Sequence, residues 1–203
     1  MNHPDPVARD SGQDPVQTWP PELLLRAQGV RVAIFDVDGV LTDGGLYYGA
    51  QGEALKRFST LDGLGLQLLR RAGIEPVVIS GRDSPALRAR LATLAVAHSA
   101  LGSEDKLPAA EKILATLQAD WTQTAVMGDD WPDLPLFARA ALACAPANAH
   151  PEARARAHHV TALRGGEGAA RQFCDLLLAA AGRYRALLDA YTTESKTVSE
   201  ALP

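Results

Sequence analysis

The chain has 203 residues, of which 47% are hydrophobic and 22% charged, a composition typical of a soluble globular protein that can bury a sizeable core. The formal net charge is −4 and lysine and arginine form no runs, which argues against nucleic acid and anionic membranes as partners. The apolar stretches are too short to cross a bilayer and the N-terminus lacks the layout of a signal peptide, so we expect a cytoplasmic protein.

Residues 1–29 carry five prolines among polar residues, which predicts a flexible leader; within it, residues 22–28 are compatible with a short helix. From Val30 onward strands alternate with helices. We predict strands at 32–35, 76–79, 96–99, 124–127, 141–145 and 159–161. We predict helices at 62–72, 84–94, 106–117, 132–139 and 151–157, and one long final helix whose apolar stripe runs from Phe173 to Tyr191.

This alternation predicts an α/β fold, a Rossmann-like parallel sheet with helices on both faces. The predicted domain covers residues 30–181, and residues 182–203 form a helical extension and tail. One segment departs from the alternation. Residues 44–58 carry Leu46, Tyr47 and Tyr48 before a glycine-containing turn and further apolar residues after it, which predicts a projecting β-hairpin.

Two carboxylates follow the first strand. The apolar run 32–35 is rich in β-branched residues and delivers Asp36 and Asp38 onto an Asp-Gly turn. One interpretation is a polar loop after a parallel strand, because Asp-Gly favours turns. The other is a cation site, because alternate side chains of an extended chain share a face and can converge on one ion. The other polar clusters decide between them.

Three further clusters are expected at the same edge of the sheet, beyond the carboxyl ends of its strands. They are Ser80, Gly81 and Arg82; Lys106; and Gly128, Asp129, Asp130 and Asp133. Carboxylates, a hydroxyl, backbone amides and an ammonium together suit phosphoryl transfer, which needs a nucleophile, a divalent cation and donors around the phosphate oxygens. Taken singly, Ser80 could cap the following helix, Lys106 could be a solvated lysine, and Arg82 and Arg90 could be surface arginines.

In this order, the motifs DVDGV (36–40), Ser80-Gly81, Lys106 and GDDWPD (128–133) resemble those of the haloacid dehalogenase superfamily of phosphohydrolases. Residues 30–181 further resemble the superfamily's phosphatases of 3-deoxy-D-manno-octulosonate 8-phosphate. That resemblance rests on DVDGVLTDG, GEALKRFSTLDG, SGR, MGDDWPDLPLF and HVTALRGGEGAARQFCDLLL. It implies a Mg²⁺-dependent phosphatase that releases phosphate from an eight- or nine-carbon sugar-acid phosphate, on the route to lipopolysaccharide.

The resemblance also implies roles for individual residues. Asp36 would attack phosphorus, and Asp38 would protonate the leaving sugar oxygen and then activate water. Mg²⁺ would be held by Asp36, the backbone carbonyl of Asp38 and Asp129. The groups expected around the phosphate are Ser80, the Gly81 amide and Lys106, with Asp130 and Asp133 orienting Lys106 and the metal waters.

The substrate side would be lined by Ser59, Thr60, Leu61, Asp62, Gly63 and Gln67, with Arg82 and Arg90 as candidates for the sugar-acid carboxylate. Leu61, Gln67 and Glu167 stand where many relatives carry a basic residue, which leaves the exact sugar acid open.

The spacing of the motifs leaves no room for a cap domain, with 41 residues between Asp38 and Ser80 and 25 between Ser80 and Lys106. An isolated hairpin with an exposed apolar face needs a cover, and another subunit is the natural one. Family members resembling this chain are tetramers in which a neighbour completes the active site, so we expect a homotetramer.

The sequence also raises alternative functions. A phosphatase of a nonulosonate 9-phosphate, or of another small sugar phosphate, would use the same motifs. A catalytically silent scaffold would keep the fold but usually lose an acid, whereas Asp36, Asp38, Asp129 and Lys106 are all present. A nucleotide-binding oxidoreductase is disfavoured because no G-x-G-x-x-G follows the first strand.

Overall fold

The computed structural model describes residues 18–199, so most of the predicted leader and the last four residues of the predicted tail lie outside the described range. Within that range, six parallel strands form one sheet in the order β5-β4-β1-β6-β7-β8. Their bounds are β1 (Val32–Phe35), β4 (Glu75–Ser80), β5 (His98–Leu101), β6 (Thr124–Met127), β7 (Leu142–Ala145) and β8 (His159–Val160). The predicted parallel sheet is confirmed.

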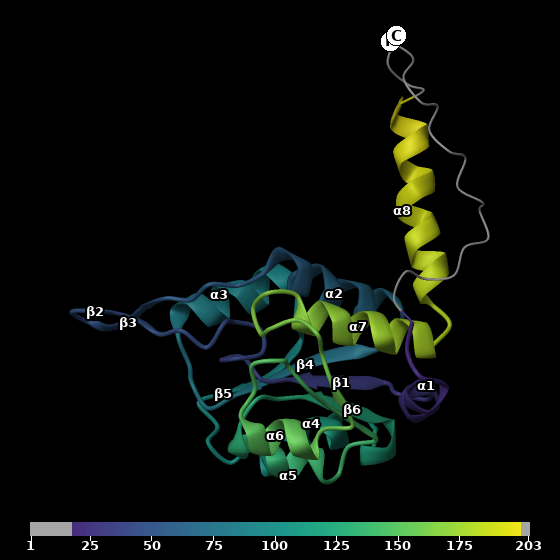
Figure 1. Cartoon of the computed structure of the whole chain (residues 1–203). Helices are drawn as coiled ribbons and strands as arrows, with labels where there is room; N and C mark the ends of the chain where they lie inside the picture. The colour runs from purple at the N-terminus through teal and green to yellow at the C-terminus, as the bar shows by residue number, and fades with distance from the viewer. Residues whose placement is uncertain (1–17, 200–203) are drawn as a thin grey trace, which may run out of the picture.

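Helices cover both faces of the sheet (Figure 1). One layer contains α1 (Pro21–Ala27), α2 (Thr60–Arg71), α3 (Pro85–Leu94) and α7 (Ala169–Ala180). The other contains α4 (Lys106–Thr116), α5 (Leu134–Phe137) and α6 (Pro151–Arg156), with short 3₁₀ turns at Trp121–Gln123 and Trp131–Asp133. Within the predicted leader, α1 is the short helix considered for residues 22–28, and its Leu23 and Ala27 are buried in the same core as α7.

Strand β1 lies between β4 and β6 and is buried along its whole length. Ala33 and Phe35 face the core under α2 and α7, whereas Val32 and Ile34 face the core under α4 and α5. The Phe35 ring meets the edge of Phe173 from α7, with ring centroids 5.7 Å apart. A strand covered on both sides needs apolar residues at every position, which explains the unbroken run VAIF.

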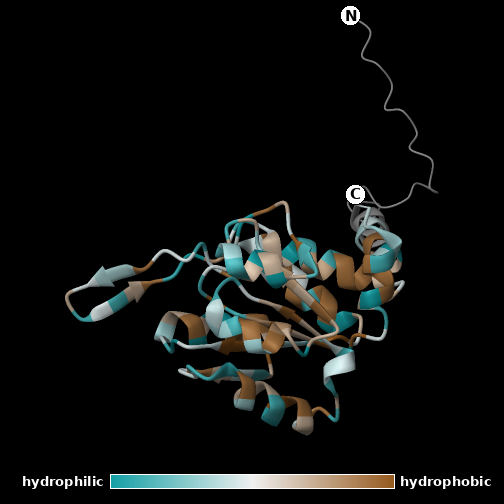
Figure 2. Cartoon of the chain, turned by 60° about the horizontal axis from the view of Figure 1, so that its bottom comes forward, coloured by the Kyte–Doolittle hydropathy of each residue, from teal (hydrophilic) through white to brown (hydrophobic). Residues whose placement is uncertain are grey.

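The predicted hairpin is present as β2 (Tyr47–Gly49) paired antiparallel with β3 (Gly52–Leu55), in a separate sheet. It projects well beyond the layered body in both orientations shown (Figures 1 and 2). Its apolar residues Leu46, Tyr47, Tyr48 and Leu55 are all exposed.

The single final helix predicted through Phe173 and Tyr191 is wrong in one respect, because the structure divides it into α7 and α8 (Tyr184–Ser199). At Gly182 the backbone turns into the left-handed region, with φ of +65°. The Gly182 N–H donates to Ala179 and the Arg183 N–H to Leu178, the paired bonds of a Schellman motif that ends a helix. The apolar stripe continues across the break because the first turns of α8 pack against α2 and α7. Because of the break, the rest of α8 projects away from the layered body (Figure 1). Between residues 18 and 199, no helix is both long enough and apolar enough to cross a membrane.

Candidate active site

The predicted polar clusters meet around one cavity of about 480 Å³ at the carboxyl ends of the central strands. Strands β1, β4 and β6 are neighbours in the sheet, so the residues that follow each of them are brought side by side. The cavity is lined by Asp36, Asp38, Ser80, Gly81, Arg82, Glu104, Lys106, Asp129, Asp130, Pro132 and Asp133. This arrangement favours the cation-site interpretation of the first two carboxylates over the plain polar loop.

The loop after β1 is held by its own hydrogen bonds. The buried hydroxyl of Thr42 accepts from the backbone N–H of Gly39 (3.4 Å) and Gly44 (3.2 Å) and donates to the Val37 carbonyl (3.3 Å). Gly39 has φ of +90°, and a β-carbon there would lie 2.1 Å from an Asp129 carboxylate oxygen. Glycine is therefore required at this position both by the turn and by the approach of Asp129.

Three carboxylates form the centre of the site. Oxygens of Asp36, Asp129 and Asp133 lie within 4.8 Å of one another. Burial, and then repulsion from Asp133, raise the pKa of Asp36 to about 6. Burial, and then repulsion from Asp36 and Asp133, raise the pKa of Asp129 to about 8. Asp36 and Asp129, predicted from separate strand ends, do come together.

Lys106 provides the ammonium inside this cluster. It is the first residue of α4, its side chain is 5% exposed, and its Nζ lies 2.7 Å from Asp36 Oδ1 and 2.6 Å from Asp133 Oδ1. Burial alone would lower the pKa of Lys106, but the charges of Asp133 and Asp36 outweigh it and raise that pKa. Lys106 is therefore not the solvated lysine considered as an alternative.

Asp133 and Asp130 organise the turn after β6. The second oxygen of Asp133 accepts from the backbone N–H of Asp129 (3.0 Å) and Asp130 (3.3 Å), so Asp133 ties that turn to Lys106. The exposed Asp130 accepts from the Trp131 N–H (2.8 Å) and, together with Asp133, forms a capping box at the start of the 3₁₀ turn.

This donor set fits a divalent cation. One ammonium stands against three nearby carboxylates, and burial, followed by repulsion among the carboxylates, raises the pKa values of Asp36 and Asp129. Carboxylate oxygens are the ligands that Mg²⁺ prefers in proteins. Asp36 and Asp129 are the available ligands, since both Asp133 oxygens already accept hydrogen bonds from Lys106 and the turn.

Ser80 and Arg82 also line the cavity. The alternative role of Ser80 as a helix cap is wrong, because the residue that caps α3 is Ser84, whose hydroxyl accepts from the Leu87 N–H (3.3 Å). Ser80 ends β4 with its Oγ accepting from the Arg82 N–H (3.1 Å). Its hydroxyl hydrogen remains available as a donor toward the cavity.

Asp38 interacts with a residue that the sequence did not single out. Lys56, just after β3, places its Nζ 2.5 Å from Asp38 Oδ1, and Arg82 Nε lies 3.6 Å from the other oxygen. Asp38 lines the same cavity, but its carboxylate is not part of the Asp36–Asp129–Asp133 cluster. Lys56 lies in the stretch GEALKRFSTLDG that carries the resemblance, but no sequence pattern predicts its contact with Asp38, because only the folded hairpin returns it to the end of β1.

Several residues predicted on the substrate side do not line this cavity. Asp62 is 2% exposed and its oxygens accept from the N–H of Arg171 (2.8 Å) and Gly168 (3.3 Å), at the start of α7. Gly63 is buried beside Arg90, whose guanidinium lies 2.3 Å from where a β-carbon would be. Asp62 and Gly63 therefore lie outside the lining of this cavity, and their place on the substrate side stays a prediction.

The other members of that predicted set lie on or near the surface, away from the cavity. Arg90 donates to the Ser59 carbonyl (3.0 Å) and lies over the Phe58 ring, 5.7 Å from its centre. The remaining members are Thr60, Leu61 and Gln67, in the first two turns of α2.

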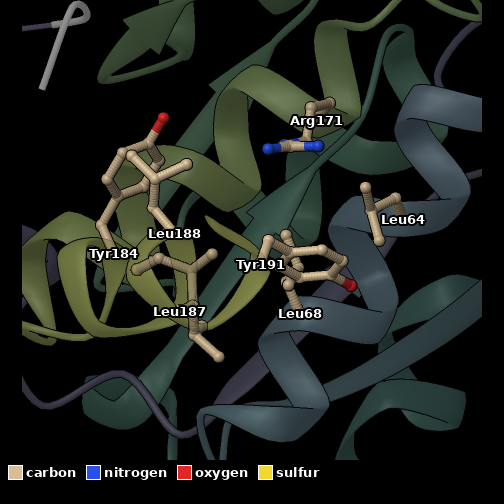
Figure 3. Close-up of a pocket in the computed structure, with 8 residues that line it drawn as sticks. Leu64, Leu68, Arg171, Tyr184, Leu187, Leu188 and Tyr191 are labelled. Carbon is tan, nitrogen blue, oxygen red and sulfur yellow. The ribbon is translucent and has the colours of Figure 1, made fainter. Parts of the chain in front are cut away.

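A second hollow, of about 190 Å³, lies between α2, α7 and α8 and is chemically different. Figure 3 shows Leu64 and Leu68 facing Leu187, Leu188 and the two tyrosines of α8, with Arg171 at one side. The Tyr191 hydroxyl accepts from Arg71 (3.0 Å). The groups for phosphoryl transfer are absent from its lining among residues 18–199, so it is not the reaction site.

Comparisons with known proteins agree with this geometry. A family model described as haloacid dehalogenase-like hydrolase matches residues 102–172. The chain is 44% identical over 159 residues to the 3-deoxy-D-manno-octulosonate 8-phosphate phosphatase of Yersinia pestis, an alignment that covers 78% of this chain and 85% of that protein.

Solved structures show the same likeness. A probable YrbI family phosphatase from Pseudomonas syringae pv. phaseolica superposes with a TM-score of 0.82 at 44% identity, covering 84% of this chain and 97% of that one. The 3-deoxy-D-manno-octulosonate 8-phosphate phosphatase of Moraxella catarrhalis, in complex with a magnesium ion, a phosphate ion and a KDO molecule, gives 0.81 at 34% identity, covering 84% and 98%. The chain therefore belongs to the haloacid dehalogenase-like hydrolases, in the family of the 3-deoxy-D-manno-octulosonate 8-phosphate phosphatases.

Proposed function

We propose that this protein is a Mg²⁺-dependent phosphatase that hydrolyses 3-deoxy-D-manno-octulosonate 8-phosphate to the free sugar acid and inorganic phosphate, in lipopolysaccharide precursor synthesis. The observation that carries the proposal is the meeting of Asp36, Asp129 and Lys106 from three separate elements in one polar cavity. The relatives in Yersinia pestis and Moraxella catarrhalis bear the name of this activity, which supports the choice of substrate.

Asp36 is the proposed nucleophile. Its carboxylate attacks phosphorus as the bond to the sugar oxygen breaks, which leaves an aspartyl-phosphate and divides the hydrolysis into two easier steps. Lys106, 2.7 Å away, holds one Asp36 oxygen and fixes the direction of the other. Asp36, the Asp38 carbonyl and Asp129 would hold Mg²⁺, which would supply positive charge to offset repulsion between the carboxylate and the phosphate.

Asp38 is the proposed acid and base. It donates a proton to the leaving sugar oxygen and then takes one from the water that hydrolyses the aspartyl-phosphate. Ser80 and the Gly81 amide donate to phosphate oxygens, and Lys106 balances their charge. Asp133 and Asp130 orient these groups rather than react, in keeping with their hydrogen bonds to Lys106 and to backbone N–H groups.

The sugar acid itself needs a partner for its carboxylate, and the half-exposed guanidinium of Arg82 at the cavity wall supports that role. We further propose a cytoplasmic homotetramer. In it, the surface carrying Ser59, Thr60, Leu61, Gln67 and Arg90 faces a neighbouring subunit's cavity. The exposed apolar residues of the hairpin support this assembly, because they need a cover.

The test is phosphate release from 3-deoxy-D-manno-octulosonate 8-phosphate, a nonulosonate 9-phosphate and glucose 6-phosphate, each measured with Mg²⁺ and with EDTA. We expect the highest kcat/KM for the octulosonate and no turnover in EDTA. A preference for the nonulosonate would replace the proposed substrate with the nine-carbon alternative. No release from any of these phosphates would favour the silent scaffold.

A further inference from the structure

We propose that Lys56, in the stem of the hairpin, is a positioning residue that holds Asp38 in the orientation needed for proton transfer. The inference rests on the proposed role of Asp38 as acid and base. It assigns to the hairpin a part in the chemistry of its own chain, apart from any contact with a neighbouring subunit.

The contacts of Lys56 are those of a fixed group. Its side chain is only 1% exposed, although it follows a strand whose residues are exposed or half-buried. Its Nζ lies 2.5 Å from Asp38 Oδ1 and 3.2 Å from Glu53 Oε1, so the ammonium sits between two carboxylates. Removing an ammonium from water is costly, and two close carboxylates are what makes it tolerable.

The consequence for Asp38 is that its two oxygens are no longer equivalent. Asp38 Oδ1 is occupied by Lys56, while Asp38 Oδ2 lies 3.6 Å from Arg82 Nε. Asp38 and Arg82 both line the reaction cavity. A carboxyl group held by one oxygen presents the other in a defined direction. Asp38 is 18 residues away from Lys56 in sequence, so the hairpin must fold to create this arrangement.

An ion pair that only fixes the hairpin to the body would not need a buried ammonium in contact with Asp38. The next residue, Arg57, already makes such a tie, since its guanidinium lies 3.3 Å from Asp43 in an exposed pair. Lys56 instead directs its charge to the cavity wall. The two neighbouring cations therefore offer a matched comparison, one touching Asp38 and one not.

In the reaction, Lys56 keeps its protons throughout. Asp38 gives its proton to the sugar oxygen as the phosphorus–oxygen bond breaks and the bond from Asp36 to phosphorus forms. The new negative charge on Asp38 then faces the Lys56 ammonium, which stabilises it. In the second step Asp38 takes a proton from the attacking water as the bond from that water to phosphorus forms and the bond from Asp36 to phosphorus breaks, which restores the Asp36 carboxylate and the protonated Asp38. Without Lys56, the carboxyl group is free to rotate, and the charge it acquires faces no buried ammonium.

The experiment compares two leaving groups, because a good leaving group does not need the acid. The variants Lys56→Met, Glu53→Gln, Arg57→Met and Asp38→Ala are assayed on 3-deoxy-D-manno-octulosonate 8-phosphate and on p-nitrophenyl phosphate. For Lys56→Met we expect kcat on the sugar phosphate to fall by about tenfold or more, a part of the 10²- to 10⁴-fold usual for a general acid, and KM to change little. On p-nitrophenyl phosphate the loss should be several-fold smaller.

Glu53→Gln keeps Lys56 but removes the negative charge of its second carboxylate partner. We therefore expect the same dependence on leaving group, with a smaller loss of activity on the sugar phosphate. Arg57→Met should match the wild type on both substrates. Equal losses on the two substrates for both Lys56→Met and Glu53→Gln would overturn the inference, since a merely structural role weakens both reactions alike. If, in addition, Asp38→Ala loses activity equally on the two substrates, the proposed acid role of Asp38 fails as well. If Asp38→Ala loses more activity on the sugar phosphate than on p-nitrophenyl phosphate, Asp38 keeps its acid role and only the role of Lys56 is lost.

Discussion

At the scale of single residues, the site is built from charges that oppose one another. Burial raises the pKa values of Asp36 and Asp129, repulsion among Asp36, Asp129 and Asp133 raises them further, and Lys106 compensates only part of that negative charge. Without a cation, the repulsion among these carboxylates makes an unfavourable contribution to the stability of the fold. A bound cation relieves the repulsion, which connects the chemistry of the site to the stability of the fold.

This gives a prediction about pH. Because the pKa values of Asp36 and Asp129 are raised above the ordinary 3.8, to about 6 and about 8, these groups favour the folded state below pH 4. That contribution is lost as pH rises through 6 and then 8. Mg²⁺ binds the carboxylates in their charged form, so the gain in Tm on adding Mg²⁺ should be larger at pH 8 than at pH 5, as measured by thermal unfolding.

Asp129→Asn is the control for this measurement, because it removes one ligand and the group with the higher pKa. Its gain in Tm on adding Mg²⁺ should be small at both pH values. Equal gains in the wild-type protein at pH 5 and pH 8 would show that the carboxylate cluster does not bind the ion.

Sequence patterns predicted part of this site for a physical reason. Asp36, Asp129 and Lys106 are far apart in the chain, but the ends of neighbouring parallel strands must meet, so their convergence could be inferred. Lys56 could not be inferred in this way, because its approach to Asp38 depends on how the hairpin bends back. The contact of Asp62 with α7 could not be inferred either, because a carboxylate at the start of a helix looks the same in sequence whether it faces a ligand or another helix.

At the scale of elements, Asp62 joins α2 to α7. Helix α7 begins after Gly168, which has no side chain to satisfy the first free N–H groups of the helix. Asp62 from α2 supplies the missing acceptors, to Arg171 N at 2.8 Å and Gly168 N at 3.3 Å. A cap of this kind contributes about 1 kcal/mol to stability, and up to about 2 in buried settings.

We therefore expect Asp62→Ala to lower the free energy of unfolding by about 1–2 kcal/mol in urea denaturation, since the α7 N–H groups lose their acceptors. KM for the sugar phosphate should not change. Asp62→Asn keeps one oxygen acceptor and should lose less stability. A raised KM with unchanged stability in Asp62→Ala would contradict the capping role and support a contact of Asp62 with the substrate.

The predicted ends of most strands and helices lie within a few residues of the observed ends. This is because the spacing of apolar residues reflects which side of each element packs into the two cores on either face of the sheet. The break between α7 and α8 was not predicted, because an apolar stripe continues through Gly182. Periodicity reports which side of a segment is buried and not whether the segment is straight. Leu187 and Tyr191 are apolar for a local reason, which is the hollow against Leu64 and Leu68 in α2 (Figure 3).

At the scale of the whole molecule, the hairpin is the part that the single chain leaves incomplete. Tyr48 is 64% exposed and Leu55 66% exposed, on strands that project from the layered body (Figure 2). Two-stranded hairpins are marginally stable alone in water. Both facts agree with the proposed homotetramer, which would cover these residues.

The corresponding prediction concerns mass in solution. Light scattering after gel filtration should give four times the mass of one chain for the wild type. Tyr48→Ser with Leu55→Ser should reduce that mass, because the buried apolar contact is lost. Leu25→Ser is a suitable control, since Leu25 is equally exposed but lies on α1. A wild-type protein with the mass of one chain would remove the argument that a neighbour completes the site.

The most direct test of the account is phosphate release by Asp36→Asn, which removes the nucleophile and nearly preserves the shape of the side chain. Asp189→Asn, an exposed substitution on α8, is the matched control. With saturating Mg²⁺ and 3-deoxy-D-manno-octulosonate 8-phosphate, the account predicts no turnover for Asp36→Asn and wild-type turnover for the control. An Asp36→Asn variant as active as the wild type would contradict an aspartyl-phosphate at this position.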